Sequence, residues 1–222
     1  MIGEAEWEWV ERQAAGDFDH LLLASSVPFL LGFGLHYLEA WNEAVCDGAW
    51  GQRAARLGEQ IRRALVLDHW ASFQHSFRRL VDLLHAVVGG ELGGPPDSVL
   101  LLSGDVHHSY LAEIGFPAGT GTRTAAWQAV CSPYRKDLHT KEKLSMRFAN
   151  SRAGAAIGRA LDRLVGVPKP PIGWRLAEDP SYENHVATLD LSPGHAALRV
   201  ETTEGSDWRG PRLRTEFERR LA

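Results

Sequence analysis

A carboxylate and two imidazoles stand close together near the middle of this chain. Asp105, His107 and His108 follow the apolar run Val99–Leu102, which is short, continuous and bounded by turn-forming residues, and so predicts a buried strand. In extended backbone, side chains two residues apart project to the same side, so we expect Asp105 and His107 together and His108 opposite. A carboxylate beside a neutral imidazole can supply half of a metal site, and open α/β sheets place their ligands at the carboxyl ends of strands.

The short motif by itself leaves a second interpretation open. An Asp–His pair can also anchor a loop through a hydrogen bond, without any ligand. Asp105, His107 and His108 therefore need support from the rest of the chain before a metal site is preferred.

Most other polar candidates have a simpler structural interpretation. Asp68 stands where a helix cap would. The segment Cys131-Ser132-Pro133 is interpreted as a packed strand end, because no general base pairs with it in the sequence. A surface, core or turn position is the more common role for the remaining candidates, which are His20, His36, His69, Trp70, His75, His85, Arg123, Arg135 and Asn184.

Composition is typical of a soluble globular protein. The 222 residues are enough for one sizeable domain or two small ones, and 44% hydrophobic with 23% charged residues is an ordinary balance. The formal net charge of -4 argues against a nucleic-acid groove. The longest strongly apolar stretch, Leu21–Leu35, contains a proline and two glycines and is too short to span a bilayer.

The first residues after Met1 are acidic rather than basic, which does not fit a signal peptide. We therefore expect a cytoplasmic location if Met1 is the true start, and export if a signal peptide lies upstream. Cys46 and Cys131 are expected to be free, buried thiols.

Periodicity and turn signals predict an alternation of helices and strands. Residues 3–15 favour an amphipathic helix, and His20–Ser26 favours a buried strand parallel to others in a sheet. The other expected elements are a loop excursion over 29–50 with a turn or two of helix in His36–Cys46, a surface helix over Gly51–Leu65, a helix from Asp68 to Val87, the central strand, a hairpin of Tyr110–Ile114 and Arg123–Cys131, helices over Lys136–Met146 and Ala155–Leu164, a hairpin of His185–Leu191 and His195–Glu201, and a helix over Arg212–Leu221. We therefore predict an α/β fold, a single domain over residues 1–222, with a layered mixed β-sheet flanked by helices.

The segment Leu101–Tyr110 resembles the late metal motif of the PhoD-like alkaline phosphatases, a branch of the calcineurin-like metallophosphoesterases. Four further segments resemble blocks of the same family in the family's order: Gly3–Trp9, Asp68-His69-Trp70 with Arg78 and Arg79, Gln128–Pro133, and Asn184–Leu189. Glu6 stands where the family usually has Gln. The resemblance covers nearly the whole chain.

The resemblance implies a sandwich of two sheets flanked by helices and a two-metal phosphoesterase site at the sheet edge. It implies Asp105 and His107 as metal ligands, and His108 as a second ligand or a catalytic group beside them. Divalent or trivalent ions such as iron, calcium, zinc or manganese are the cofactors expected, and a small-molecule phosphoester is the substrate. Such sites use a metal-activated hydroxide, with both ions neutralising charge on the phosphoryl oxygens.

Two departures from the family pattern matter. The strand His20–Ser26 ends in Ser25 and Ser26, where the wider superfamily has a ligand histidine before a proline, although PhoD-like enzymes commonly differ here too. The family's early motifs, Gly-Asp-x-x-Tyr and Asp-Asp-His among them, have no counterpart, since Asp17-x-Asp19-His20 stands at the amino end of its strand. A dinuclear site needs roughly six donors around each hard metal.

We therefore interpret the chain as the carboxyl-terminal portion of such an enzyme, whose missing amino-terminal half is its expected partner. Two alternatives stay open. One is a non-catalytic α/β scaffold or interaction module derived from the fold. The other is a fragment that does not fold alone, because it would expose apolar strand edges.

Overall fold

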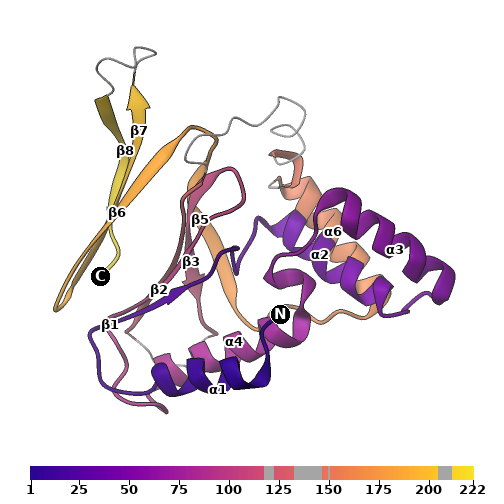
Figure 1. The fold of residues 1–222 in the computed structure, drawn as a ribbon, viewed down its shortest axis with the longest axis horizontal. Helices are drawn as coiled ribbons and strands as arrows, with labels where there is room; N and C mark the ends of the chain where they lie inside the picture. The colour runs from indigo at the N-terminus through magenta and orange to yellow at the C-terminus, as the bar shows by residue number, and fades with distance from the viewer. Residues whose placement is uncertain (118–122, 133–146, 150, 205–211) are drawn as a thin grey trace. The chain divides into compact units, whose positions relative to one another are not determined.

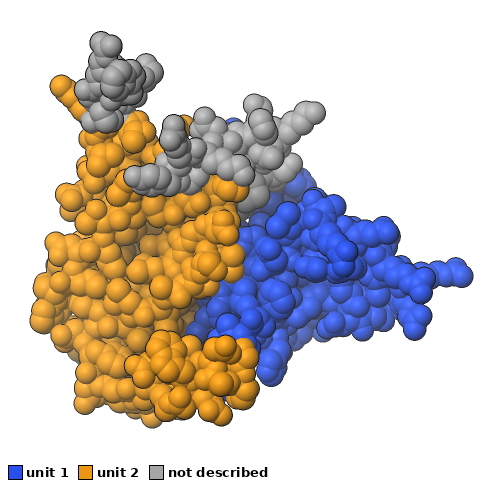
Figure 2. All heavy atoms as spheres, in the orientation of Figure 1, with its two compact units in different colours: residues 1–2, 29–81, 139–171 blue, residues 3–28, 82–138, 172–222 orange. Residues whose placement is uncertain are grey.

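The computed structural model describes residues 1–117, 123–132, 147–149, 151–204 and 212–222. The chain divides into two compact units (Figure 2). Unit 1 comprises Met1–Ile2, Phe29–Val81 and His139–Pro171, and unit 2 comprises Gly3–Pro28, Asp82–Leu138 and Ile172–Ala222. The expectation of a single domain over residues 1–222 stays a prediction.

Unit 2 contains a five-stranded mixed sheet (Figure 1). Its strands are β1 (His20–Ala24), β2 (Ser98–Ser103), β3 (Ser109–Gly115), β4 (Ala125–Val130) and β5 (Gly173–Ser181), in the order β1-β2-β4-β3-β5. Strands β1, β2 and β4 are parallel, whereas β3 runs antiparallel to both β4 and β5. The carboxyl ends of the three parallel strands therefore meet at one edge of the sheet.

A second, antiparallel sheet in unit 2 is built from β6 (His185–Ser192), β7 (His195–Glu204) and β8 (Arg212–Arg220). It packs on the five-stranded sheet through one hydrophobic cluster, made of Leu100, Leu111, Trp127, Ala196, Leu198, Val200 and Leu221. The indole N–H of Trp127 donates to the carbonyl oxygen of Leu221 at 2.9 Å, so the one polar group of that side chain is satisfied inside the cluster.

His20 joins the two sheets of unit 2 at their edge. Its Nδ1 lies 2.8 Å from the hydroxyl of Ser98 on β2, and its Nε2 lies 2.8 Å from the carbonyl oxygen of Ser192 at the end of β6. Unit 2 also contains α1 (Glu4–Gln13), which buries Trp7. The layered α/β arrangement with a mixed sheet is thus as the sequence predicts.

Unit 1 is helical. It contains α2 (Phe33–Cys46), α3 (Gln52–Leu65), the short 3-10 helix η1 (Trp70–Ser72), α6 (Arg152–Val165) and the first part of α4 (Gln74–Val88). Helix α2 contacts both α3 and α6 (Figure 1). Phe29 packs against Trp70 and Phe77, with ring centroids 5.7 Å and 4.7 Å away.

Helices α2 and α6 cross closely because small residues meet at the crossing. A Cβ at Gly34 would come within 2.3 Å of the carbonyl oxygen of Ala149, and one at Gly158 within 2.7 Å of the Cβ of Tyr37. Glycine is thus required there for packing, and α2 continues through Gly34 without ending.

Several expectations from the sequence are confirmed, namely the helices at α1, α3 and α6, the parallel strands β1 and β2, and the hairpins β3–β4 and β6–β7. Two are wrong. Most of the expected loop excursion over 29–50 is helix α2. The expected helix over Arg212–Leu221 is strand β8, because that segment forms backbone hydrogen bonds with β7. Strand β5 was not expected, and the helix expected over Lys136–Met146 lies outside the described residues.

The expected helix from Asp68 to Val87 is instead two elements, and Asp68 does not cap the first of them. Residue His69 precedes η1 without a side-chain cap. The backbone N–H of Gln74, at the start of α4, donates to the Glu43 carboxylate at 2.9 Å from each oxygen. The cap is thus supplied by a neighbouring helix, which no local pattern reveals. Over the described ranges, no helix has the length and apolar character that crossing a membrane requires.

Candidate functional site

The loop of residues 104–108 leaves β2 at the edge where the parallel strands end. The backbone N–H of Gly104 donates to the carbonyl oxygen of Ser26, just beyond β1, at 3.3 Å. On the other side, the N–H of Cys131, just beyond β4, donates to the carbonyl oxygen of Ser103 at 3.0 Å. The loop is thus framed by both neighbouring strands, at the usual ligand-binding edge of a parallel sheet.

The backbone of this loop is left-handed at two residues. Asp105 and His107 both have a φ of 56°. Among the described non-glycine residues, only Val66 shares a positive φ with them. The expectation that residues 105–108 continue in extended backbone is therefore wrong, and alternation no longer argues for Asp105 and His107 on one side. Such conformations are uncommon outside glycine and concentrate at functional sites.

The three candidate side chains differ in exposure. Asp105 is exposed, His107 is half-buried and His108 is 3% exposed. The carboxylate of Asp105 is therefore accessible to an ion from solvent, and the motif is not sealed in the hydrophobic interior.

Two serines hold the backbone of His107. Its N–H donates to the hydroxyl oxygen of Ser132 at 3.2 Å. Ser132 is itself fixed by Ser109, whose hydroxyl accepts from the N–H of Ser132 at 3.0 Å and donates to its carbonyl oxygen at 3.1 Å. The loop is thus tied to the outer ends of β3 and β4.

His108 is directed into the interior. Its Nδ1 lies 2.7 Å from the carbonyl oxygen of Val106, and because a carbonyl only accepts, Nδ1 carries the proton. The ring stacks on Tyr110 with centroids 5.2 Å apart and lies tilted against Tyr182 at 5.7 Å. The Tyr110 hydroxyl in turn accepts from the Gln128 amide at 3.1 Å. A catalytic role for His108 stays a prediction.

The donors at this edge fit a metal ion in part. Asp105 offers carboxylate oxygen and His107 offers imidazole nitrogen, a mixed set that suits iron, manganese or zinc. The hydroxyl of Ser103, at the end of β2, is buried without a hydrogen-bond partner in the part of the chain that is described. Those same residues contain no group of three or more histidine, cysteine or acidic side chains arranged to hold an ion. Ligation of an ion by Asp105 and His107 therefore stays a prediction.

Several other candidates have structural partners. His69 lies on Glu39 in unit 1, with Nδ1 2.6 Å from Oε1. His185 lies on Glu216 in unit 2, with Nε2 2.5 Å from Oε2. His36 is 1% exposed, and burial lowers its pKa to about 3, so the ring stays neutral. Of the rest, Asp68, His75 and Arg123 are exposed, Trp70 is buried, Asn184 and His85 are half-buried, and Arg135 lies outside the described residues.

Cys131 is not activated as a nucleophile. Burial raises the pKa of its thiol above the ordinary value. Burial likewise raises the pKa of the Cys46 thiol. Both cysteines are free and half-buried. The interpretation of Cys131-Ser132 as a packed strand end is therefore consistent with the chemistry, although Ser132 also contacts the loop.

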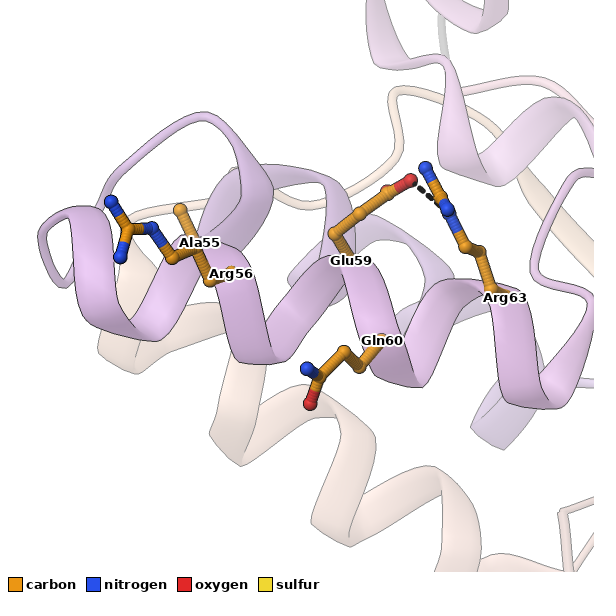
Figure 3. A pocket seen from close by; sticks show the side chains of 5 residues that line it. All are labelled: Ala55, Arg56, Glu59, Gln60 and Arg63. Carbon is orange, nitrogen blue, oxygen red and sulfur yellow. Dashed lines mark hydrogen bonds and ion pairs between the residues drawn. The ribbon is translucent and has the colours of Figure 1, made fainter.

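A shallow hollow on the surface of unit 1 is lined by Ala55, Arg56, Glu59, Gln60 and Arg63, all on α3 (Figure 3). Glu59 is occupied within its own helix, because it accepts from Arg62 and Arg63, both at 2.7 Å. These contacts lower the pKa of Glu59 to about 2. Since one helix supplies every wall, the hollow lacks the converging groups of a binding site.

Ser109 and Tyr182 were not among the sequence candidates. The signal for Ser109 was available, because the predicted hairpin brings the residue before its first strand beside the residue after its second. Tyr182 follows β5, which the sequence did not indicate.

Comparison with protein-family models, with curated proteins and with solved structures found no match for this chain.

Proposed function

We propose that this chain is the carboxyl-terminal portion of a metal-dependent phosphoester hydrolase of PhoD-like type, with Asp105 and His107 as ligands of a divalent or trivalent ion. One observation carries the proposal. The two residues of the motif are also two of the three described non-glycine residues with positive φ, and they lie at the carboxyl edge of parallel strands.

The backbone strain argues for a ligand rather than a simple loop anchor. A left-handed residue that is not glycine costs about 1 kcal/mol or more relative to its ordinary conformation. A turn with no ligand could use glycine at either position at no such cost. Within the described part of the chain, the Asp105 carboxylate makes no hydrogen bond or ion pair that would anchor the loop, and its exposed position leaves the oxygens open to an ion.

Each residue has a distinct part in the proposed reaction. A bound ion would supply an activated hydroxide and neutralise charge on the phosphoryl oxygens. Asp105 would contribute negative charge and oxygen ligation, and His107 would contribute a neutral nitrogen ligand. His108, with Nδ1 protonated and its ring fixed between two tyrosines, would support the loop from inside. The further ligands belong, in this proposal, to an amino-terminal half.

Metal binding tests the proposal directly. Manganese titration of the full chain, followed by electron paramagnetic resonance, should show one weak site that Asp105→Ala and His107→Ala each abolish. The matched control is Asp190→Ala, which removes an exposed carboxylate from β6. A cooperatively folded chain that binds no ion would reject the proposal in favour of a non-catalytic α/β module.

Activity supplies the second test. Adding the amino-terminal half, in one chain or as a second polypeptide, should restore hydrolysis of an aryl phosphodiester. Asp105→Ala and His107→Ala should then each lower the rate by a factor of about 100 or more, since each removes a ligand. An unchanged rate in both variants would show that the site has been assigned to the wrong residues.

A further inference from the structure

The serine pair Ser109 and Ser132 links the β3–β4 hairpin to the proposed metal loop. The hairpin register pairs Tyr110 with Val130, so Ser109 and Ser132 lie just outside the last paired rung. Here the Ser109 hydroxyl bonds both the N–H and the carbonyl oxygen of Ser132. The Ser109 side chain thus makes the two hydrogen bonds that a strand backbone would otherwise make, and it fixes the backbone of Ser132.

Because Ser132 is held in this way, its own hydroxyl has a defined position. That hydroxyl oxygen accepts the N–H of His107 from across the loop. The accepted N–H belongs to one of the two left-handed residues. The hydrogen bond therefore opposes the tendency of His107 to relax toward an ordinary backbone conformation, which would redirect its imidazole.

We propose that Ser132 is a positioning residue of the metal site, which holds His107 in the left-handed conformation needed to present its imidazole to an ion. This inference rests on the proposed function. Ser132 acts through the backbone of His107 and itself contacts neither ion nor substrate. Groups that orient metal ligands in this way are part of the site's affinity as well as its geometry.

The structure offers a substitution that isolates this single contact. Ser132→Ala removes the hydroxyl acceptor but keeps the N–H and carbonyl oxygen that bind Ser109, so the hairpin end retains both of its hydrogen bonds. Ser132→Thr keeps a hydroxyl at the same carbon and is the conservative rescue. Ser192→Ala is the matched control, because Ser192 is exposed and its contacts with His20 and with the β7 strand use backbone atoms, which the substitution retains.

Two measurements on the full chain test the proposal. Amide hydrogen exchange by nuclear magnetic resonance reports the His107 N–H without any metal, and manganese titration reports affinity at the site. Ser132→Ala should speed exchange of the His107 amide and weaken manganese binding by about tenfold, the usual effect of losing a group that orients a ligand. Ser132→Thr should restore both readouts, and Ser192→Ala should change neither.

The outcomes separate this inference from the proposed function. If the unaltered chain binds no manganese, the metal site is rejected and the positioning role with it. If the unaltered chain binds manganese but Ser132→Ala binds it equally well, the positioning role alone is wrong. Unchanged exchange of the His107 amide in Ser132→Ala, or weak binding that Ser132→Thr does not rescue, would also overturn it.

Discussion

An acidic residue and a histidine occur together twice in this protein, once as a contact in space and once as neighbours in a loop, and the two settings are opposite. In unit 1, Glu39 is fully buried and its carboxylate lies 2.6 Å from Nδ1 of His69. In unit 2, Asp105 is exposed and the nearby His107 is half-buried, on a backbone with two left-handed residues. Glu39 stands within the regular helix α2, so no strain accompanies its contact.

The difference indicates what each grouping is for. A carboxylate buried beside an imidazole fixes neighbouring segments to one another, and its removal leaves polar atoms unpaired in the interior. A strained loop with an exposed carboxylate is expected to contribute little to stability, and under the proposed function its strain serves a ligand. Residue type alone does not distinguish these two settings, whereas burial and backbone conformation do.

The largest expected effect is on the buried grouping. Glu39→Ala should lower the free energy of unfolding by about 3 kcal/mol, because it leaves His69 Nδ1 without its carboxylate and creates a cavity. Urea unfolding followed by circular dichroism measures the change. Asp105→Ala, the exposed counterpart, should change the free energy by less than about 0.5 kcal/mol. Equal effects in the two variants would contradict the distinction.

A second effect concerns acidic groups of unit 1 whose pKa is raised by burial. Burial raises the pKa of Asp162 on α6 to about 7, from an ordinary value of 3.8. The folded state therefore holds a proton that the unfolded state has lost, so stability falls as pH rises from about 4 to about 7. Asp162→Asn should remove this part of the loss.

Unfolding of the unaltered chain and Asp162→Asn at pH 4 and pH 8 measures this effect. The variant should gain on the order of 1–2 kcal/mol relative to the unaltered chain at pH 8, and nothing at pH 4. Glu43, whose pKa burial also raises to about 7, retains its own contribution, so the pH dependence should shrink but not vanish. An equal difference at both pH values would show that Asp162 does not titrate differently on folding.

The strained loop should behave in the opposite way to the buried pair. Asp105→Gly relieves a left-handed conformation, so it should leave stability unchanged or raise it by up to about 1 kcal/mol while abolishing manganese binding. Thermal unfolding and the manganese titration measure the two quantities. A clear loss of stability in Asp105→Gly would mean that the carboxylate anchors the loop, which is the interpretation that the sequence left open.

The smallest effect is expected at an ion pair that is exposed as well as unstrained. Arg63 contacts Glu59 on the surface of α3 at 2.7 Å. Arg63→Ala should lower the free energy of unfolding by about 0.5 kcal/mol or less, because solvent screens such pairs. The same urea titration measures it, with Arg53→Ala on the same helix as the control. If Arg63→Ala lowered the free energy of unfolding as much as Glu39→Ala, burial would not be what determines how much such a pair contributes to stability.

Strands with continuous apolar runs and clear turn residues could be predicted from the sequence. Val99–Leu102 and the turn after Ser192 indicate their own structure locally. Helix α2 was recognised only as a turn or two within His36–Cys46, because Gly34 has a packing role that only the position of α6 explains. Strand β8 is rich in charged residues, and Phe217 and Leu221 have a spacing that also suits a helix. Pairing with β7 makes this segment a strand and not a helix.

The sequence proposed the residues of the candidate site, but it did not predict their backbone geometry. The types and spacing of Asp105 and His107 point to ligation, and the strand before them indicates the sheet edge. Both residues are left-handed, and the N–H of His107 donates to the hydroxyl of Ser132, 25 residues further along the chain. Local periodicity assumes regular backbone, so it anticipates neither the left-handed conformation nor a contact with so distant a residue.

The contacts of His20 with both sheets of unit 2 fix the hydrogen-bonding role of each ring nitrogen. The carbonyl oxygen of Ser192 can only accept, so Nε2 of His20 donates to it. With its hydrogen on Nε2, the ring accepts the Ser98 hydroxyl at Nδ1. Because one side chain bonds a residue of each sheet, replacing His20 with Phe would remove both links at once.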